Sequence, residues 1–125
     1  EFKKIGEEIK ADFPALNYGK GYDNCFMIND YEAGQLQTAA QLYSPESGRQ
    51  LEVLTTQPAV QIYTGNWLEG CPAGKCGRGY HDYEGVAIEC QHCPDSPNKP
   101  DYPTTVLRPG ETFSEAIIWA FSVRK

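Results

Sequence analysis

Short runs in which apolar and polar residues alternate recur along the chain, and this pattern is typical of strands with one buried face. In residues 85–91 (GVAIECQ) the apolar side carries Val86, Ile88 and Cys90, and Glu89 falls on the opposite side. A carboxylate beside such neighbours loses part of its water, which raises its basicity. Glu89 is therefore a candidate general base, and the alternative is an ordinary solvated strand face.

The first 28 residues combine a helical pattern with a strand. Apolar spacings of three and four in residues 2–16 predict a turn or two of helix, which Pro14 ends or keeps from extending. Residues 17–21 contain two glycines and are predicted as a loop, followed by a strand over 22–28. Asp23 stands at the start of that strand, where it is either a turn residue or a ligand contact.

The middle of the chain predicts a hairpin and one further strand. Residues 36–43 and 49–56 alternate on either side of a Ser-Pro-Glu-Ser-Gly turn, so we expect them to pair. The strand within residues 57–66 places Gln61 and Tyr63 on the same side. An amide beside an aromatic ring suits a sugar, because the amide bonds hydroxyls and the ring covers C–H groups. The alternative is a solvated polar strand face.

The last 59 residues are less regular. Residues 67–83 are rich in glycine and predict an irregular excursion, which either covers a site or is a plain surface loop. Residues 92–103 contain four prolines and cannot form a central strand. Two more strands are predicted, a short one at 105–107 and a nearly continuous apolar one at 116–123 that we expect to be buried on both faces.

Composition narrows the fold class and the partners. A chain of 125 residues is long enough for one domain, and its eight Tyr, twelve Gly and nine Pro favour an all-β fold. A net charge of -6 would repel nucleic acid and an anionic membrane surface, so neither is an expected partner. No apolar run approaches the roughly 20 residues of a membrane span. Five cysteines leave at least one thiol unpaired, which favours a reducing, cytoplasmic compartment.

Paired cysteines offer one metal interpretation. The spacings Cys71-x4-Cys76 and Cys90-x2-Cys93 could supply four thiolates to zinc, giving a zinc-stabilised interaction domain. The first spacing is loose for such a site, and Cys90 falls on the apolar side of its strand, where a small thiol is commonplace. The lone histidines, His81 and His92, stand beside no recognisable nucleophile motif.

Seven short motifs follow one another in a specific order and spacing. They are residues 21–24 (GYDN), 47–49 (SGR), 55–58 (TTQP), 60–66 (VQIYTGN), 89–91 (ECQ), 94–98 (PDSPN) and 107–111 (LRPGE). In this order they resemble the C-terminal half of the aldose 1-epimerases, or galactose mutarotases, from about residue 3 to the end. Each motif alone is weak, but the series is specific.

The resemblance implies an antiparallel β-sandwich of the galactose mutarotase type, of which residues 1–125 are the C-terminal portion of a single domain. It implies an isomerase that interconverts the α and β anomers of a hexose such as glucose or galactose. The family's catalytic base falls on Glu89, and its sugar-binding aspartate and glutamine fall on Asp23 and Gln61. Ring opening by general acid and base needs no metal and no redox cofactor.

The resemblance also implies a partner. The family's acid histidine belongs to the N-terminal half, which is expected as a separate chain or an additional segment, and this chain alone would hold a base without its acid. Neither His81 nor His92 matches the acid. Two other interpretations stay open: a noncatalytic carbohydrate-binding module on the same fold, and the zinc-stabilised domain.

Overall fold

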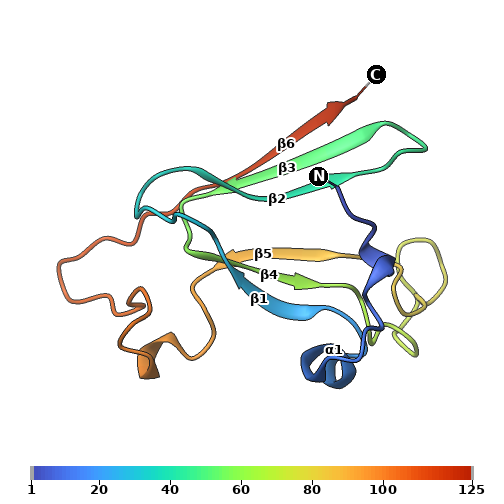
Figure 1. Cartoon of the computed structure of the whole chain (residues 1–125), viewed down its shortest axis with the longest axis horizontal. Helices are drawn as coiled ribbons and strands as arrows, with labels where there is room; N and C mark the ends of the chain where they lie inside the picture. The colour runs from blue at the N-terminus through green and yellow to red at the C-terminus, as the bar shows by residue number, and fades with distance from the viewer. Residues whose placement is uncertain (1, 125) are drawn as a thin grey trace. The chain divides into compact units, whose positions relative to one another are not determined.

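The computed structural model describes residues 2–124 as a mostly β structure (Figure 1). Its strands are β1 (Asp23–Met27), β2 (Gln37–Tyr43), β3 (Arg49–Thr55), β4 (Ala59–Tyr63), β5 (Ala87–Gln91) and β6 (Ile117–Val123). The helical parts are α1 (Pro14–Gly19) and two single 3-10 turns at Ile5–Glu7 and Ser96–Asn98. The predicted all-β class is confirmed. None of the helices within the described residues is long and apolar enough to cross a bilayer.

The chain forms two compact units. The first unit comprises Glu1–Asn24 and Gln61–Ile88, and the second comprises Cys25–Val60 and Glu89–Lys125. A three-stranded sheet has the order β1-β4-β5, and the division between the units crosses all three of its strands.

The second sheet lies wholly within the second unit and has the order β2-β3-β6 (Figure 1). Both pairings are antiparallel, with Val53 of β3 opposite Ala40 on one side and Trp119 on the other. The register shifts between Thr38 and Ala40, which marks an irregularity in β2. The predicted hairpin of two strands around a turn is confirmed.

Residues directly opposite each other share a face, so one face of this sheet is mostly apolar and the other is mixed, with Leu54 and Ile118 beside its polar side chains. On the mixed face, Thr38 Oγ1 and Gln41 Nε2 both donate to Glu52 Oε1, at 3.1 and 2.9 Å. On the apolar face Val53 is fully buried, while Trp119 beside it is 49% exposed. The covering of this face therefore stops between β3 and β6.

Strand β6 is exposed, so the expectation that it is buried on both faces is wrong. Phe121 is 75% exposed and Val123 is 67% exposed. As one of the two edge strands of its sheet, β6 has a neighbour, β3, on one side only. Edge position is not the whole cause, because the other edge strand, β2, is mostly half-buried. A continuous apolar run indicates that a strand has apolar side chains on both faces, but it does not show that these 125 residues bury them.

The N-terminal helix also differs from the prediction. Pro14 begins α1 instead of ending it, because a proline at the first helical position loses no hydrogen bond and has a suitable φ. Helix α1 continues through Gly19, within the segment predicted as a loop. It ends where Lys20 takes a left-handed conformation, φ 57°, with its backbone N–H bonded to the Leu16 carbonyl.

The predicted strand at 105–107 is absent. These residues lie in irregular backbone, and Val106 and Leu107 are each 56% exposed. Two physical reasons account for the error: prolines at 103 and 109 interrupt ladder bonding, and β3 already has a neighbour on both edges. A run of three apolar or β-branched residues is too short to predict a strand.

Candidate functional site

The centre of the candidate site in the first unit is a hydrogen-bonded pair of side chains. Gln61 Nε2, from β4, donates to Asp23 Oδ1, from the start of β1, at 2.7 Å. The structure thus brings together two of the three residues that the sequence singled out. Because the amide holds one carboxylate oxygen, the exposed carboxylate keeps further acceptor capacity for hydroxyl groups.

The other end of the Gln61 amide is unsatisfied. Its Oε1 atom is buried and has no hydrogen-bond partner among the described residues. A buried acceptor without a donor costs about 1–3 kcal/mol. Gln57 Oε1 is buried and unpaired in the same way, so this atom alone does not mark a binding site.

Asn66 fixes the loop beside this pair, and its side chain is fully buried. Its Nδ2 donates to the carbonyls of Gly19 and Tyr22, at 2.8 and 2.9 Å, and its Oδ1 accepts from Thr64 Oγ1. Thr64 Oγ1 also accepts from the backbone N–H of Tyr22 at 3.1 Å. This Asn66 lock ties the end of β4 to the residue that precedes Asp23. The sequence motif contained Thr64 and Asn66 but gave no signal of this role.

Aromatic side chains continue the site from β4 into the following loop. The Tyr63 hydroxyl accepts a hydrogen bond from the Trp67 backbone N–H at 3.0 Å. The Trp67 ring is 57% exposed, and Lys20 Nζ lies 3.7 Å from its centroid. Tyr83 donates its hydroxyl proton to the Lys20 carbonyl at 2.6 Å, so three segments of the first unit meet at Lys20. The Tyr63 hydroxyl thus accepts from the protein's own backbone and keeps its proton to donate.

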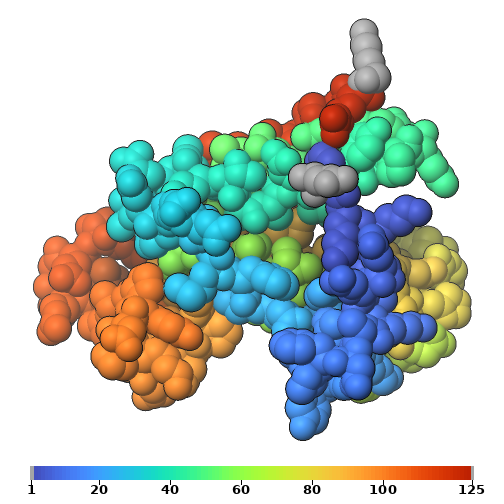
Figure 2. Space-filling view, viewed as in Figure 1, coloured from blue at the N-terminus to red at the C-terminus, as the bar shows by residue number. Residues whose placement is uncertain are grey.

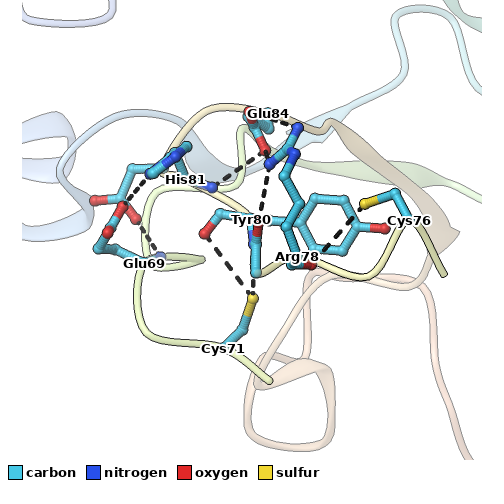
Figure 3. A network of polar contacts seen from close by, with 9 residues as sticks. Glu69, Cys71, Cys76, Arg78, Tyr80, His81 and Glu84 are labelled. Carbon is cyan, nitrogen blue, oxygen red and sulfur yellow. Dashed lines mark hydrogen bonds and ion pairs between the residues drawn. The ribbon is translucent and has the colours of Figure 1, made fainter. Parts of the chain in front are cut away.

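The glycine-rich loop of residues 67–84 is held by its own polar contacts (Figure 3). Arg78 binds both oxygens of Glu84, at 2.8 and 3.1 Å, and the Arg78 guanidinium lowers the pKa of that carboxyl. His81 Nδ1 lies 2.9 Å from Glu69 Oε2, and this contact raises the pKa of His81. The prediction of irregular backbone is confirmed, while a covering role for the loop stays a prediction.

The loop cysteines bond to backbone and not to each other. Cys71 Sγ accepts from the Tyr80 backbone N–H at 3.2 Å, and Figure 3 shows it pointing toward that residue. Cys76 is exposed, with its Sγ 3.9 Å from the Arg78 carbonyl. Within residues 2–124 no three or more His, Cys, Asp or Glu side chains are grouped to hold a metal ion. The two cysteine pairs of the four-thiolate interpretation lie in different units, so that interpretation stays a prediction.

Glu89 belongs to the second unit, where it stands in the middle of β5. Its side chain is exposed, so the expected partial loss of water is wrong. Its neighbour Cys90 is half-buried and interacts with the Thr55 hydroxyl, and burial raises the pKa of its thiol. Of the five residues of β5 only Glu89 is exposed, whereas Ala87, Ile88, Cys90 and Gln91 are all half-buried, so its carboxylate is accessible to a ligand.

The second unit also contains a contact between thiols. Burial, and then the neighbouring Cys93, raise the pKa of Cys25 to about 11. A thiol with so high a pKa stays protonated near neutral pH and is a poor nucleophile. All five cysteines are free thiols, and these two serve as small apolar groups.

Comparison with known proteins identifies the class of protein. Residues 1–119 match the family described as Aldose 1-epimerase, so this chain belongs to the aldose 1-epimerase family. The predicted resemblance is confirmed.

Two curated relatives show how much of such a protein the chain represents. Galactose mutarotase of Rattus norvegicus is 42% identical over 103 residues, which is 82% of this chain and 30% of the relative. Aldose 1-epimerase of Escherichia coli (strain K12) is 40% identical over 121 residues, which is 95% of this chain and 34% of the relative. The chain therefore spans about a third of the length of these relatives.

A solved structure supports the fold. The crystal structure of a GalM/aldose epimerase homologue from C. elegans superposes with a TM-score of 0.72 at 29% identity. The similarity covers 83% of this chain and 30% of that one. The antiparallel β-sandwich class expected from the sequence is thereby confirmed.

Proposed function

We propose that this chain is part of an aldose 1-epimerase that interconverts the α and β anomers of a hexose such as glucose or galactose. The rest of the enzyme is supplied by a second part, which we call the complementary portion. In a family member, this is the part of the chain that does not align with residues 1–125. The observation that carries the proposal is the Asp23–Gln61 pair at 2.7 Å, in which the exposed Asp23 carboxylate keeps acceptor capacity for sugar hydroxyls.

In this proposal Asp23 and Gln61 position the sugar and Glu89 removes a proton. Asp23 and Gln61 accept hydrogen bonds from ring hydroxyls, and a site built to bond hydroxyls rejects analogues that lack them. Glu89 takes the proton from the anomeric hydroxyl, while an acid histidine of the complementary portion protonates the ring oxygen. The bond between C1 and the ring oxygen breaks, C1 becomes an aldehyde carbonyl, and reclosure on its other face gives the other anomer.

Two features support the role of Glu89. It lies on a strand, whose backbone holds a side chain more firmly than a loop does, and its carboxylate is exposed to an incoming ligand. General acid and general base catalysis each contribute about 10²- to 10⁴-fold to a rate. An accessible base on β5 and an acid from elsewhere are therefore sufficient for a ring-opening reaction without a cofactor.

Polarimetry on freshly dissolved α-D-galactose tests the proposal. The chain combined with the complementary portion of rat galactose mutarotase should speed the approach to anomeric equilibrium, and the chain alone should not. Glu89→Gln should lower the acceleration at least about 100-fold, because it removes the base. The control Glu46→Gln, in the exposed hairpin turn, should leave the rate unchanged. If the mixture assembles and gives no acceleration, the proposal is wrong.

A noncatalytic carbohydrate-binding module is the second candidate function. The observation that favours it is that the Asp23–Gln61 pair lies wholly within the first unit and could accept hydroxyls without Glu89. Calorimetry separates the two candidates. Sugar binding that is unaltered by Glu89→Gln and is accompanied by no change in the rate of mutarotation would favour the binding module.

A further inference from the structure

Tyr83, near the end of the glycine-rich loop, has a strained backbone. Its φ is 68°, in the left-handed region that glycine adopts freely and a bulky aromatic residue rarely adopts. The side chain is 44% exposed, so burial of the ring does not account for the strain. Strain of this kind persists only where surrounding contacts hold it, and it is concentrated at functional sites.

Two hydrogen bonds connect Tyr83 to other segments of the first unit. Its backbone N–H donates to the carbonyl of Gly65, just after the strand that carries Gln61, at 2.8 Å. Its hydroxyl donates at 2.6 Å to the carbonyl of Lys20, in the turn between α1 and Asp23. In Figure 2 the atoms of the glycine-rich loop, in yellow-green to yellow, lie beside the blue atoms of the N-terminal residues. Tyr83 therefore braces the turn before β1 against the end of β4.

Side chains hold three carbonyls of this turn. Asn66 Nδ2 donates to the carbonyls of Gly19 and Tyr22, at 2.8 and 2.9 Å, and Tyr83 bonds the carbonyl of Lys20 between them. A peptide plane whose carbonyl is bonded cannot rotate without losing that bond. The path of the turn is therefore restricted from two sides, by the end of β4 and by the end of the glycine-rich loop.

The same turn bounds the Asp23 side chain. Lys20 has φ 57°, which reverses the chain after α1. A Cβ atom added at Gly19 would lie 3.5 Å from the Cβ atom of Asp23, so the aspartate packs against the start of the turn. Any displacement of the turn would therefore move the Asp23 carboxylate.

We propose that Tyr83 is a positioning residue for the sugar site. By holding the Lys20 carbonyl, it fixes where the Asp23 carboxylate lies relative to Gln61, and this determines how tightly a hexose is bound. Tyr83 acts through the turn and needs no contact with the sugar. The strained backbone is the cost of placing its hydroxyl on that carbonyl.

The inference rests on the proposed function, because the position of Asp23 matters only if Asp23 binds the sugar. The two differ in the quantity that they predict. Tyr83 affects the affinity for the hexose, whereas Glu89 affects the conversion of the bound hexose. Affinity and conversion are measured separately, so the two proposals can fail separately.

The test compares Tyr83→Phe with the unmodified chain, each assembled with the complementary portion of rat galactose mutarotase. The variant loses the hydroxyl and keeps the ring and the backbone N–H. The KM for galactose, and the dissociation constant from calorimetry, should rise about two- to tenfold, the range that corresponds to one net hydrogen bond. The kcat should not change, because the base is untouched. A merely structural role would lower the stability of the chain and leave both constants of the folded assembly unaltered.

Tyr83→Asn is the second variant. Asparagine tolerates a left-handed backbone, and its side chain is too short to reach as far as the tyrosine hydroxyl. It should raise KM at least as much as Tyr83→Phe, although its backbone is less strained. A normal KM in Tyr83→Asn would overturn the inference, because the conformation of the loop would then suffice without the hydroxyl.

Tyr18→Phe is the matched control, because it removes the same hydroxyl from a ring of α1 that is 87% exposed. It should leave KM and kcat unchanged. Equal KM values for Tyr83→Phe and the unmodified chain would overturn the inference. An equal rise in Tyr18→Phe would do so too, as would a loss of kcat in Tyr83→Phe with no change in KM.

Glu89→Gln separates the two proposals. In this background mutarotation should be lost, and Tyr83→Phe should still weaken galactose binding by the same factor. Galactose binding that depends on Tyr83, in an assembly without mutarotation, would sink the proposed function and support the positioning role. Mutarotation that depends on Glu89, with a KM indifferent to Tyr83→Phe, would do the reverse. An assembly that binds no galactose would overturn both.

Discussion

Within residues 2–124 the Gln61 side chain has one bonded and one unbonded polar atom. Its Nε2 is committed to Asp23 and its buried Oε1 has no donor. Gln41 forms a comparable amide-to-carboxylate bond with Glu52 at 2.9 Å on the mixed face of the other sheet. Comparing the Gln61–Asp23 pair with the Gln41–Glu52 pair separates a contribution to sugar binding from a contribution to the fold alone.

Replacing Gln61 by Ala should weaken hexose binding about 10- to 100-fold, because hydrogen bonds to charged groups contribute about 1.5–3 kcal/mol. Titration calorimetry with galactose, on the chain assembled with its complementary portion, measures the change. Gln41→Ala removes the comparable bond to Glu52 and should leave the affinity unaltered. Equal losses for both variants would show that Gln61 has no special role in the site.

The Asn66 lock leaves no room at Gly21. This glycine has φ 147°, and a Cβ atom there would lie 2.7 Å from Asn66 Oδ1. Gly21→Ala should therefore lower the free energy of unfolding by about 1–3 kcal/mol, the usual cost of a strained backbone residue. Urea denaturation of the chain measures it. Gly6→Ala, whose added methyl meets nothing within 4 Å, should be nearly neutral, and equal midpoints for the two variants would contradict the lock.

For single residues, the sequence predicts the candidate site residues better than it predicts their contacts and exposure. The alternating pattern placed Asp23 at the start of a strand and Gln61 inside another, and both positions are as expected. It could not predict that the two side chains meet, because the pairing of β1 with β4 joins residues 38 positions apart. It also misjudged the exposure of Glu89, since the packed neighbours Ile88 and Cys90 point to the other face.

Among the elements, the loop of residues 67–84 has the greatest concentration of charged contacts in the first unit (Figure 3). The pair of His81 and Glu69 and the pair of Arg78 and Glu84 titrate in different pH ranges. The pKa of His81 is raised above 6.5, so the contribution of its pair is complete below pH 6.5 and is lost as pH rises through the folded value. The pKa of Glu84 is lowered, so its pair loses strength only as pH falls below about 4.5.

The His81 ring should accordingly titrate above pH 6.5 in proton NMR, and Glu69→Gln should move the midpoint down toward 6.5. The Arg78–Glu84 pair is unaffected over this range, so the loop stays anchored while His81 is followed. Glu46→Gln, which lies in the hairpin of the other unit, serves as the control. A midpoint that does not change in Glu69→Gln would show that the 2.9 Å contact is not maintained in solution.

The errors in element prediction have a common cause. Local pattern gave the hairpin and β4 correctly, because alternation and turn residues are properties of neighbouring positions. Two errors concern backbone hydrogen bonds: α1 begins at Pro14, and the strand predicted at 105–107 is missing. Both depend on which backbone N–H and C=O groups have hydrogen-bond partners. The exposure of β6 depended in part on its position at the edge of a sheet, which a pattern along one strand does not contain.

For the whole molecule, the small apolar core has consequences for stability. Among residues 2–124 the buried hydrophobic residues are Leu16, Val53, Ala59, Val60 and Cys93. Of these, Leu16 lies in the first unit and the other four lie in the second. Cores of this size supply little stability, whereas one face of β6 leaves apolar side chains 49 to 75% exposed: Ile117, Trp119, Phe121 and Val123. The folded chain should therefore gain substantially from any association that covers that face.

The complementary portion should raise the stability of the chain by mass action. At a free concentration 100 times its dissociation constant, it should add about 2.7 kcal/mol to the free energy of unfolding. Chemical denaturation of the chain at increasing concentrations of that portion measures the gain. A midpoint independent of concentration would mean that the portion does not bind the folded state.

Cys76 offers a practical route to these measurements. Of the five thiols, all within the described residues, it alone is exposed, while Cys93 is buried and Cys25 stays protonated near neutral pH. A maleimide dye should therefore attach selectively at the tip of the loop, without any engineered cysteine. Fluorescence anisotropy of that dye would then report assembly in real time, at concentrations far below those that calorimetry needs.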